Sequence, residues 1–163
     1  MAWTLLLAAG QGNRLASATG GLAKQFLDWK GAPLYWESAL VFSRCARVDG
    51  LVFVFPEACI DEERERVAGL MRNASLGIPW KVVAGGALRQ DSVRNGLAAL
   101  PGDCMEVLIH DAARPFVSPV LVNRILDGLH GEASGECVAA CIPGIPVVDT
   151  IKVMDEEKKV VAT

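Results

Sequence analysis

Two basic residues, Arg14 and Lys24, lie in a glycine-rich segment that follows an apolar run near the start of the chain. This segment, residues 8–26, reads AAGQGNRLASATGGLAKQF and contains no carboxylate. Gly10 and Gly12 allow backbone N–H groups to approach a ligand closely, because glycine has no Cβ. Amides that point in one direction form a concavity that binds anions. These residue types predict a loop that binds phosphate, and a simple tight turn is the alternative.

Two familiar phosphate-binding motifs fit this segment poorly. GQGNRL resembles the start of the dinucleotide fingerprint, but Leu15 occupies the third glycine position, which that motif needs for close packing of helix on strand. A Walker A loop requires a Lys-Ser/Thr pair after its glycines, and the segment has no such pair. A dehydrogenase is therefore disfavoured, and a long dicationic loop suited to a triphosphate is favoured.

Two more polar segments follow later apolar runs. In GGALRQDSV, Gly85 and Gly86 permit close approach to a base or ribose, and Ser92 can donate a hydrogen bond. In HDAARPF, Asp111 and Arg114 are candidates for a site beside a polyphosphate. Mg²⁺ prefers one or two carboxylates together with phosphates. The alternatives are a helix-entry turn for the first segment and a structural Asp–Arg pair for the second.

The elements that must position these residues are short strands alternating with helices. Continuous apolar character, typical of strands covered on both faces, predicts strands at residues 3–9, 50–55, 80–84, 106–111 and 136–142. Amphipathic patterns predict helices at residues 34–45, 61–74, 89–100 and 118–129. Ser118 is a suitable N-cap for the last helix, with Pro119 at its first position. This order predicts an α/β fold, a three-layer Rossmann-like sandwich with a mostly parallel sheet.

Composition narrows the class of protein. The 163 residues are 52% apolar, which fits one domain with a substantial core. The net charge is −3 and the cations are scattered, which excludes the basic stripe of a nucleic-acid binder. No apolar run reaches the roughly 18 residues of a membrane span. Five cysteines without CxxC spacing indicate neither zinc nor a disulfide framework, and predict a cytoplasmic protein. His110 and His130 are expected to have structural rather than catalytic roles.

Residues 147–163, VVDTIKVMDEEKKVVAT, depart from the alternating pattern. Two β-rich pieces around an acidic turn predict a β-hairpin arm that projects from the sheet. A two-stranded ribbon is barely stable alone, so we expect a partner, such as a second subunit, to cover it. A frayed extension is the alternative.

The motifs LLAAGQGNRL, KQF, GGALRQDSV, HDAARPFV and VVDTIK resemble, in order and spacing, those of the 2-C-methyl-D-erythritol 4-phosphate cytidylyltransferases of non-mevalonate isoprenoid biosynthesis. HDAARP together with RQDSV is the most specific part of the resemblance. It implies transfer of CMP from CTP to methylerythritol phosphate with release of pyrophosphate. It also implies Mg²⁺ as cofactor and a homodimer joined through the arm at residues 147–163.

The resemblance also implies roles for individual residues. Arg14 and Lys24 match a pair that stabilises the transition state, and Asp111 matches the metal ligand. Arg114 and Thr150 match contacts to methylerythritol phosphate, with Thr150 reaching across the dimer. The residues that match CTP contacts are Ala8, Ala9, Gly10, Gly12, Gly86 and Ser92.

Members of this family continue after the position of Thr163 with an arginine, further helices and a late lysine that position the acceptor. We therefore expect the single nucleotidyltransferase domain at residues 1–163 to lack its C-terminal part. The chain could be truncated, natively short, or fused to a second enzyme of the pathway. Two other functions stay open: a cytidylyltransferase that acts on a pentitol phosphate, and a CTP-binding module without turnover.

Overall fold

The computed structural model describes residues 1–10, 22–131, 135–146, 148, 150 and 152–162. These residues form two compact units, Met1–Arg124 and Ile125–Thr163. The organisation of residues 1–163 as a single domain stays a prediction.

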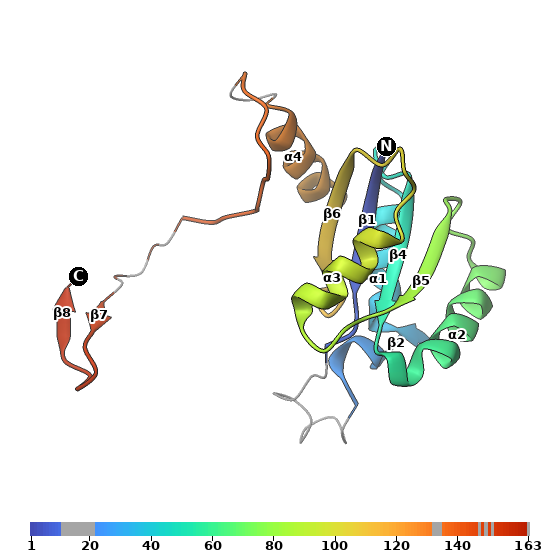
Figure 1. The fold of residues 1–163 in the computed structure, drawn as a ribbon, viewed down its shortest axis with the longest axis horizontal. Helices are drawn as coiled ribbons and strands as arrows, with labels where there is room; N and C mark the ends of the chain where they lie inside the picture. The colour runs from blue at the N-terminus through green and yellow to red at the C-terminus, as the bar shows by residue number, and fades with distance from the viewer. Residues whose placement is uncertain (11–21, 132–134, 147, 149, 151, 163) are drawn as a thin grey trace. The chain divides into compact units, whose positions relative to one another are not determined.

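The first unit is built on a four-stranded parallel sheet in the order β5-β4-β1-β6 (Figure 1). Its strands are β1 (Ala2–Leu7), β4 (Gly50–Phe55), β5 (Trp80–Ala84) and β6 (Glu106–Asp111). Four of the five predicted strands are thus confirmed, three of them with the predicted bounds. Every residue of the two central strands, β1 and β4, is buried, as expected for strands covered on both faces.

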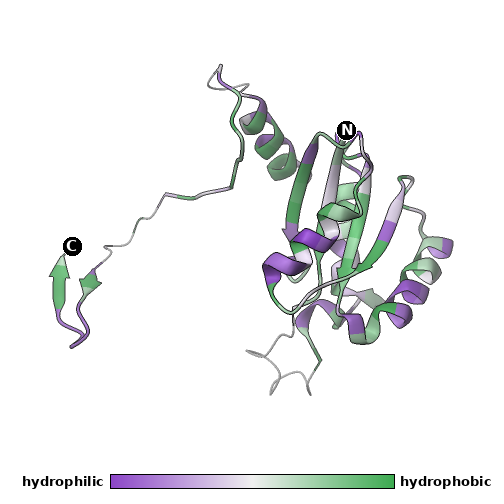
Figure 2. Ribbon diagram, viewed as in Figure 1, coloured by the Kyte–Doolittle hydropathy of each residue, from purple (hydrophilic) through white to green (hydrophobic). Residues whose placement is uncertain are grey.

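Helices cover both faces of this sheet. In Figure 1, α1 (Leu34–Ser43) lies behind β1 and β4, and α3 (Arg89–Ala98) lies in front of them. Figure 2 shows that β4 and β6 are mostly hydrophobic, whereas much of α2 (Ile60–Asn73) is hydrophilic. The three-layer α/β architecture is therefore confirmed. No helix among the described residues is both long and apolar enough to cross a membrane.

A buried polar contact joins α1 to α2. The Tyr35 hydroxyl donates a hydrogen bond of 2.8 Å to the Glu63 carboxylate, and both side chains are buried. Burial, with a smaller effect of the Glu63 charge, raises the pKa of Tyr35, so the hydroxyl stays a donor. Arg66 lies 3.0 Å from the other Glu63 oxygen and balances its charge.

The last helix, α4 (Pro119–His130), begins as the sequence predicts. The Ser118 hydroxyl accepts a hydrogen bond of 3.2 Å from the backbone N–H of Leu121, which satisfies a donor in the first turn. Ser118 is thus the N-cap.

The second unit contains the predicted hairpin. Its antiparallel strands are β7 (Val153–Met154) and β8 (Val160–Ala162). Asp155 accepts hydrogen bonds from the backbone N–H groups of Glu157 and Lys159 and so stabilises the turn. The hairpin within residues 147–163 is therefore confirmed.

The predicted strand at residues 136–142 is wrong: the structure assigns no strand to these described residues. The backbone N–H of Val138 donates to the carbonyl of Leu129 at 3.1 Å, and the Cys137 thiol donates to the carbonyl of His130. The segment therefore bonds to the end of α4 and not to a neighbouring strand. All five cysteines lie in described parts of the chain, and each is a free thiol.

Candidate functional site

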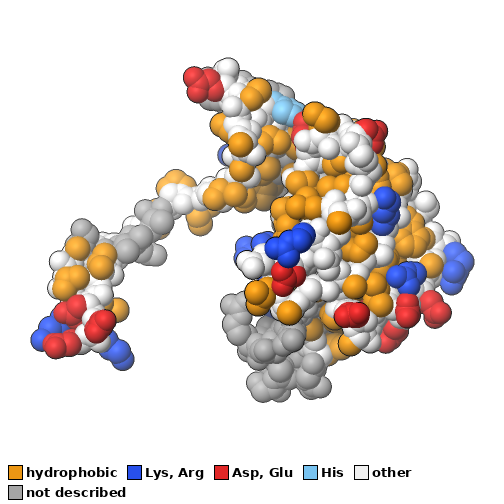
Figure 3. Space-filling view, viewed as in Figure 1, with side chains coloured by type: hydrophobic (Ala, Val, Ile, Leu, Met, Phe, Trp, Pro, Cys, Tyr) orange, Lys and Arg blue, Asp and Glu red, His pale blue; other side chains and the backbone are white. Residues whose placement is uncertain are grey.

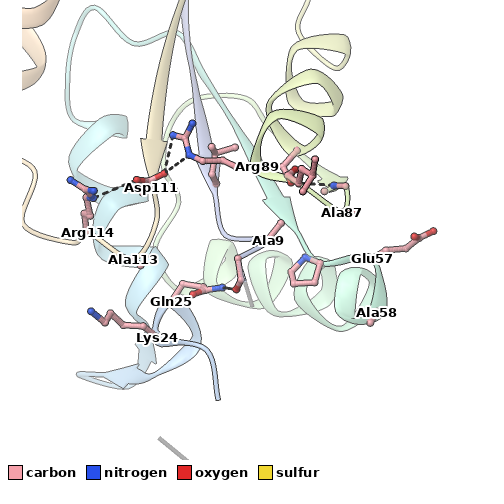
Figure 4. Close-up of a pocket in the computed structure, with 17 residues that line it drawn as sticks. Ala9, Lys24, Gln25, Glu57, Ala58, Ala87, Arg89, Asp111, Ala113 and Arg114 are labelled. Carbon is pink, nitrogen blue, oxygen red and sulfur yellow. Dashed lines mark hydrogen bonds and ion pairs between the residues drawn. The ribbon is translucent and has the colours of Figure 1, made fainter. Parts of the chain in front are cut away.

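A pocket of about 1070 Å³ lies at the carboxyl edge of the sheet (Figure 4). The carboxyl ends of parallel strands meet at one edge, and ligands of open α/β sheets bind there. The chain after β1 contributes Ala9 and Gly10 to the lining, and the chain after β5 contributes Gly85 and Gly86. Asp111 ends β6 and lines the same pocket.

Gln25 fixes the backbone immediately after β1. Its side-chain amide donates hydrogen bonds to the carbonyls of Ala8 and Gly10, each at 2.7 Å, and the residue is 4% exposed. Gln25 belongs to the short helix η1 (Lys24–Phe26), so this contact also fixes the segment that carries Lys24. The carbonyls that Gln25 binds are those of the predicted phosphate loop.

We expect Gln25→Leu to lower the free energy of unfolding by about 2–3 kcal/mol, because two carbonyls lose their donor. Urea denaturation followed by circular dichroism measures this difference. Gln90→Leu is the matched control, since Gln90 is exposed on α3, and we expect its effect to stay within about 0.5 kcal/mol. Equal stability of the two variants would contradict the role of Gln25.

Gly85 and Gly86 are positions where backbone packs too closely for a side chain. A Cβ on Gly85 would overlap the side chain of Ala9 and lie 2.8 Å from the Ser92 Oγ. A Cβ on Gly86 would overlap the side chain of Asp91. The glycines therefore allow β5, α3 and the loop after β1 to converge at the pocket.

Ser92 stabilises the segment from Gly86 to Leu88 at the pocket. Its Oγ accepts a hydrogen bond of 3.1 Å from the N–H of Gly86 and donates to the carbonyl of Leu88 at 3.3 Å. The residue is 4% exposed and lines the pocket. The predicted contacts of Gly86 and Ser92 with base and ribose stay predictions.

Asp111 sits between two guanidinium groups (Figure 4). Its Oδ1 accepts hydrogen bonds from Arg89 Nε at 3.2 Å and Arg89 Nη2 at 3.0 Å. Its Oδ2 lies 3.4 Å from Arg114 Nε. The Asp–Arg pair that the sequence left as an alternative is therefore present, with Arg89 as an additional partner. The predicted role of Asp111 as a metal ligand stays a prediction.

His110 supports the turn that joins Asp111 to Arg114. Its Nε2 lies 3.0 Å from the carbonyl of Arg114 and 3.3 Å from the Oγ of Ser38 on α1. A carbonyl can only accept, so Nε2 carries the proton. Burial lowers the pKa of His110, with smaller opposing contributions from the Arg114 carbonyl and Asp111. This arrangement agrees with the structural role expected for His110.

The described lining residues give the pocket a net positive charge. Lys24, Arg89 and Arg114 contribute three positive charges, against two negative charges from Glu57 and Asp111. The Glu57 carboxylate points away from the cluster at Asp111 (Figure 4). A positively charged cleft attracts a polyphosphate and raises its local concentration.

Most of the predicted site residues lie at this pocket. The lining includes Ala9, Gly10, Lys24, Gly86, Ser92, Asp111 and Arg114. Ala8, which directly follows β1, is buried. Gly12 and Arg14 lie outside the described residues, and Thr150 is exposed in the second unit; the roles predicted for these three stay predictions.

Sequence reasoning missed two parts of the site, Gln25 and the wall formed by Pro56, Glu57 and Ala58. The wall directly follows β4, so the rule that polar segments follow strand ends could have found it. It escaped because it contains neither glycine nor a cation.

The donor atoms at the pocket fit a hard divalent cation such as Mg²⁺. Within the part of the chain that the structure describes, no cluster of three or more His, Cys, Asp or Glu side chains could hold a metal. Among the described residues that line the pocket, Asp111 alone offers a carboxylate beside the basic side chains. This set fits Mg²⁺, which is held by one or two carboxylates together with substrate phosphates and water.

A family model described as 2-C-methyl-D-erythritol 4-phosphate cytidylyltransferase, IspD, matches residues 2–163. The bifunctional enzyme IspD/IspF of Oleidesulfovibrio alaskensis is 52% identical over 154 residues, which are 94% of this chain and 37% of that one. The 2-C-methyl-D-erythritol 4-phosphate cytidylyltransferase of Clostridium botulinum is 33% identical over 153 residues, 94% of this chain and 61% of that one.

A solved structure shares the fold. The crystal structure of 4-diphosphocytidyl-2C-methyl-D-erythritol synthase from Anaerococcus prevotii superposes with a TM-score of 0.73 at 20% identity. The match covers 100% of this chain and 64% of that one. The chain thus spans 37% of the length of its bifunctional relative and less than two thirds of the two single enzymes.

Proposed function

Because the chain belongs to the 2-C-methyl-D-erythritol 4-phosphate cytidylyltransferase family, we propose that it transfers CMP from CTP to 2-C-methyl-D-erythritol 4-phosphate and releases pyrophosphate. One observation carries the proposal: Lys24, Asp111 and Arg114 converge on a single glycine-walled pocket at the carboxyl edge of the sheet.

The reaction is an in-line displacement at the α-phosphorus of CTP. An oxygen of the acceptor phosphate forms the new P–O bond as the bond to pyrophosphate breaks. The acceptor phosphate is already ionised at neutral pH, so it needs no general base. The main obstacles are repulsion between two anions and the charge that develops at the α-phosphoryl oxygens. Fixed cations aimed at such charge are an effective form of catalysis.

We assign these tasks to residues of the pocket. Lys24, together with Arg14, stabilises the developing charge, and Arg114 holds the acceptor phosphate. The backbone of Ala9 and Gly10 binds the triphosphate of CTP. This assignment agrees with the phosphate-binding loop that the sequence predicts after β1. Asp111 would hold Mg²⁺, which when bound supplies further positive charge at the phosphates. We assign Thr150 to a contact with the methylerythritol phosphate bound in the pocket of a partner subunit.

The test measures pyrophosphate released by the full chain with Mg²⁺. We expect release only when CTP and 2-C-methyl-D-erythritol 4-phosphate are both present. Parallel reactions replace the acceptor by a pentitol phosphate or CTP by ATP. Faster release with the pentitol phosphate would overturn the acceptor assignment. If CTP binds but none of these reactions releases pyrophosphate, the proposed catalysis is overturned. The chain would then be a nucleotide-binding module without turnover.

We expect His110 to act on the acceptor through Arg114. His110→Phe keeps a ring against Phe42, whose centroid lies 5.1 Å from that of His110, but removes the donor to the Arg114 carbonyl. Because misplaced contacts are costly in catalysis, the KM for the acceptor should rise roughly tenfold, with less change in the KM for CTP. Initial-rate kinetics with each substrate varied in turn measures this split.

His110→Gln is the matched variant for this test, because its side-chain amide retains an N–H donor. It should restore the acceptor KM towards the wild-type value. An acceptor KM that is unchanged in His110→Phe, or equally raised in both variants, would contradict a role through this hydrogen bond.

We also infer a homodimer formed through the hairpin. Hydrophobic side chains lie on its strands and charged ones gather at its turn (Figure 3), and Val153, Met154, Val160 and Val161 are all more than half exposed. Apolar strands of so short a ribbon need a partner surface. Val160→Lys should therefore shift the sedimentation coefficient to that of a monomer, whereas Lys158→Ala in the turn should not. A dimer that persists in Val160→Lys would contradict this interface.

A further inference from the structure

The pair formed by Arg89 and Asp111 has a consequence for the order in which ligands bind. We propose that Arg89 occupies the Asp111 carboxylate in the nucleotide-free chain and exchanges it for the phosphates of an incoming nucleotide. Arg89 is then a further nucleotide-binding residue and keeps the metal-binding carboxylate from acting without nucleotide. This inference rests on the proposed function, because it assumes that the pocket takes a nucleoside triphosphate.

The geometry makes Arg89 the stronger partner of Asp111. Two of its nitrogens, Nε and Nη2, lie within 3.2 Å of Oδ1. Arg114 approaches Oδ2 with one nitrogen at 3.4 Å, and it belongs to the same turn as Asp111. Arg89, by contrast, is the first residue of α3 and reaches the carboxylate from another element. The pair therefore joins two walls of the pocket.

The same contact is easily exchanged. The Arg89 side chain is 64% exposed and that of Asp111 is 37% exposed. Ion pairs between exposed groups contribute little net free energy, because water screens them. A guanidinium group matches phosphate oxygens as well as it matches a carboxylate. A triphosphate in the pocket thus offers Arg89 an alternative partner of higher charge. Little free energy is lost when the exposed ion pair with Asp111 breaks.

Charge in the pocket makes this exchange favourable for metal binding. A divalent cation at Asp111 would lie next to the Arg89 guanidinium, and like charges at such distances repel. With nucleotide present, Arg89 can move to the phosphates, and Asp111 becomes available. Metal and nucleotide should therefore bind with positive coupling, each raising the affinity for the other.

The experiment measures Mn²⁺ binding to the full chain by electron paramagnetic resonance, first without nucleotide. Arg89→Gln should bind Mn²⁺ roughly 3–10-fold more tightly than the wild type, because a neighbouring positive charge is removed. Calorimetry with CTP should show a loss of affinity of roughly tenfold in the same variant, because a charged phosphate contact is lost. Asp111→Asn identifies the site and should abolish this Mn²⁺ binding.

Arg94→Gln is the matched control. Arg94 lies on the same helix and pairs with Asp91 at 3.1 Å, but it is not among the described residues that line the pocket. It should change neither affinity. Unchanged or weaker Mn²⁺ binding in Arg89→Gln overturns the proposal, as does unchanged CTP affinity. Tighter Mn²⁺ binding together with weaker CTP binding in Arg89→Gln supports the proposal, whether or not the chain releases pyrophosphate. Absence of pyrophosphate release would overturn only the proposed function.

Discussion

Lys24→Ala is expected to lower turnover by roughly 10²–10³-fold, the usual cost of removing one donor that stabilises transition-state charge. Lys24 lines the pocket from η1, which the Gln25 contacts hold beside the phosphate loop. CTP affinity should fall much less, because Arg89 and Arg114 still contribute positive charge to the pocket. Pyrophosphate release measures the first quantity, and calorimetric titration with CTP measures the second.

Lys30→Ala is the control for this experiment. Lys30 is exposed, stacks over the Trp29 ring at 5.5 Å, and is not among the described residues that line the pocket. Its turnover should match that of the wild type. Circular dichroism should show the same unfolding midpoint for Lys24→Ala and wild type, since Lys24 is exposed. Undiminished turnover in Lys24→Ala would remove Lys24 from the catalytic machinery.

Asp111→Asn is expected to lower turnover at limiting magnesium by about 10²-fold, the scale of loss when one stabilising charge at the reacting phosphate is removed, and to raise the magnesium concentration needed for half-maximal rate. A neutral amide is a poor ligand for a hard cation that prefers carboxylate oxygen. The substitution also releases Arg89 and Arg114 from their shared anion, which alters the charge of the pocket. Initial rates over a magnesium titration measure both effects.

Asp103→Asn provides the comparison, because Asp103 is an exposed carboxylate outside the described lining of the pocket. Its magnesium titration should superpose on that of the wild type. If the titration of Asp111→Asn also superposes, Asp111 does not bind the metal and is only the anion that holds the two arginines.

The backbone of the first unit was largely predictable from sequence. β4, β5 and β6 match their apolar runs residue for residue. β4 is buried along its whole length, as continuous apolar character predicts, whereas β5 and β6 are the outer strands of the sheet and are only partly buried. Ligands of open α/β sheets bind at the carboxyl ends of the strands. This regularity predicts that Lys24, Gly86 and Asp111 share one site, and all three line the pocket. Backbone topology thus accounts for most of the predicted site.

Side-chain partners were harder to predict, since they depend on tertiary distances. Nothing in KQF indicates that Gln25 would bind two carbonyls seventeen and fifteen positions away. The pairing of Arg89 with Asp111 joins residues 22 positions apart on different elements. The strand predicted at residues 136–142 failed for a related reason, because apolar composition cannot supply the neighbouring strand that a sheet requires.

The register of β6 against β1 determines the position of the Asp111 carboxylate at the pocket. Leu7, the last residue of β1, is paired directly with Asp111, the last residue of β6. Successive side chains of a strand point to opposite faces, so a slip of one position would turn the carboxylate away from its arginines. Deletion of a single residue inside β6 should therefore abolish function far more thoroughly than the loss of a surface loop residue, and homologues should vary in length only between their strands.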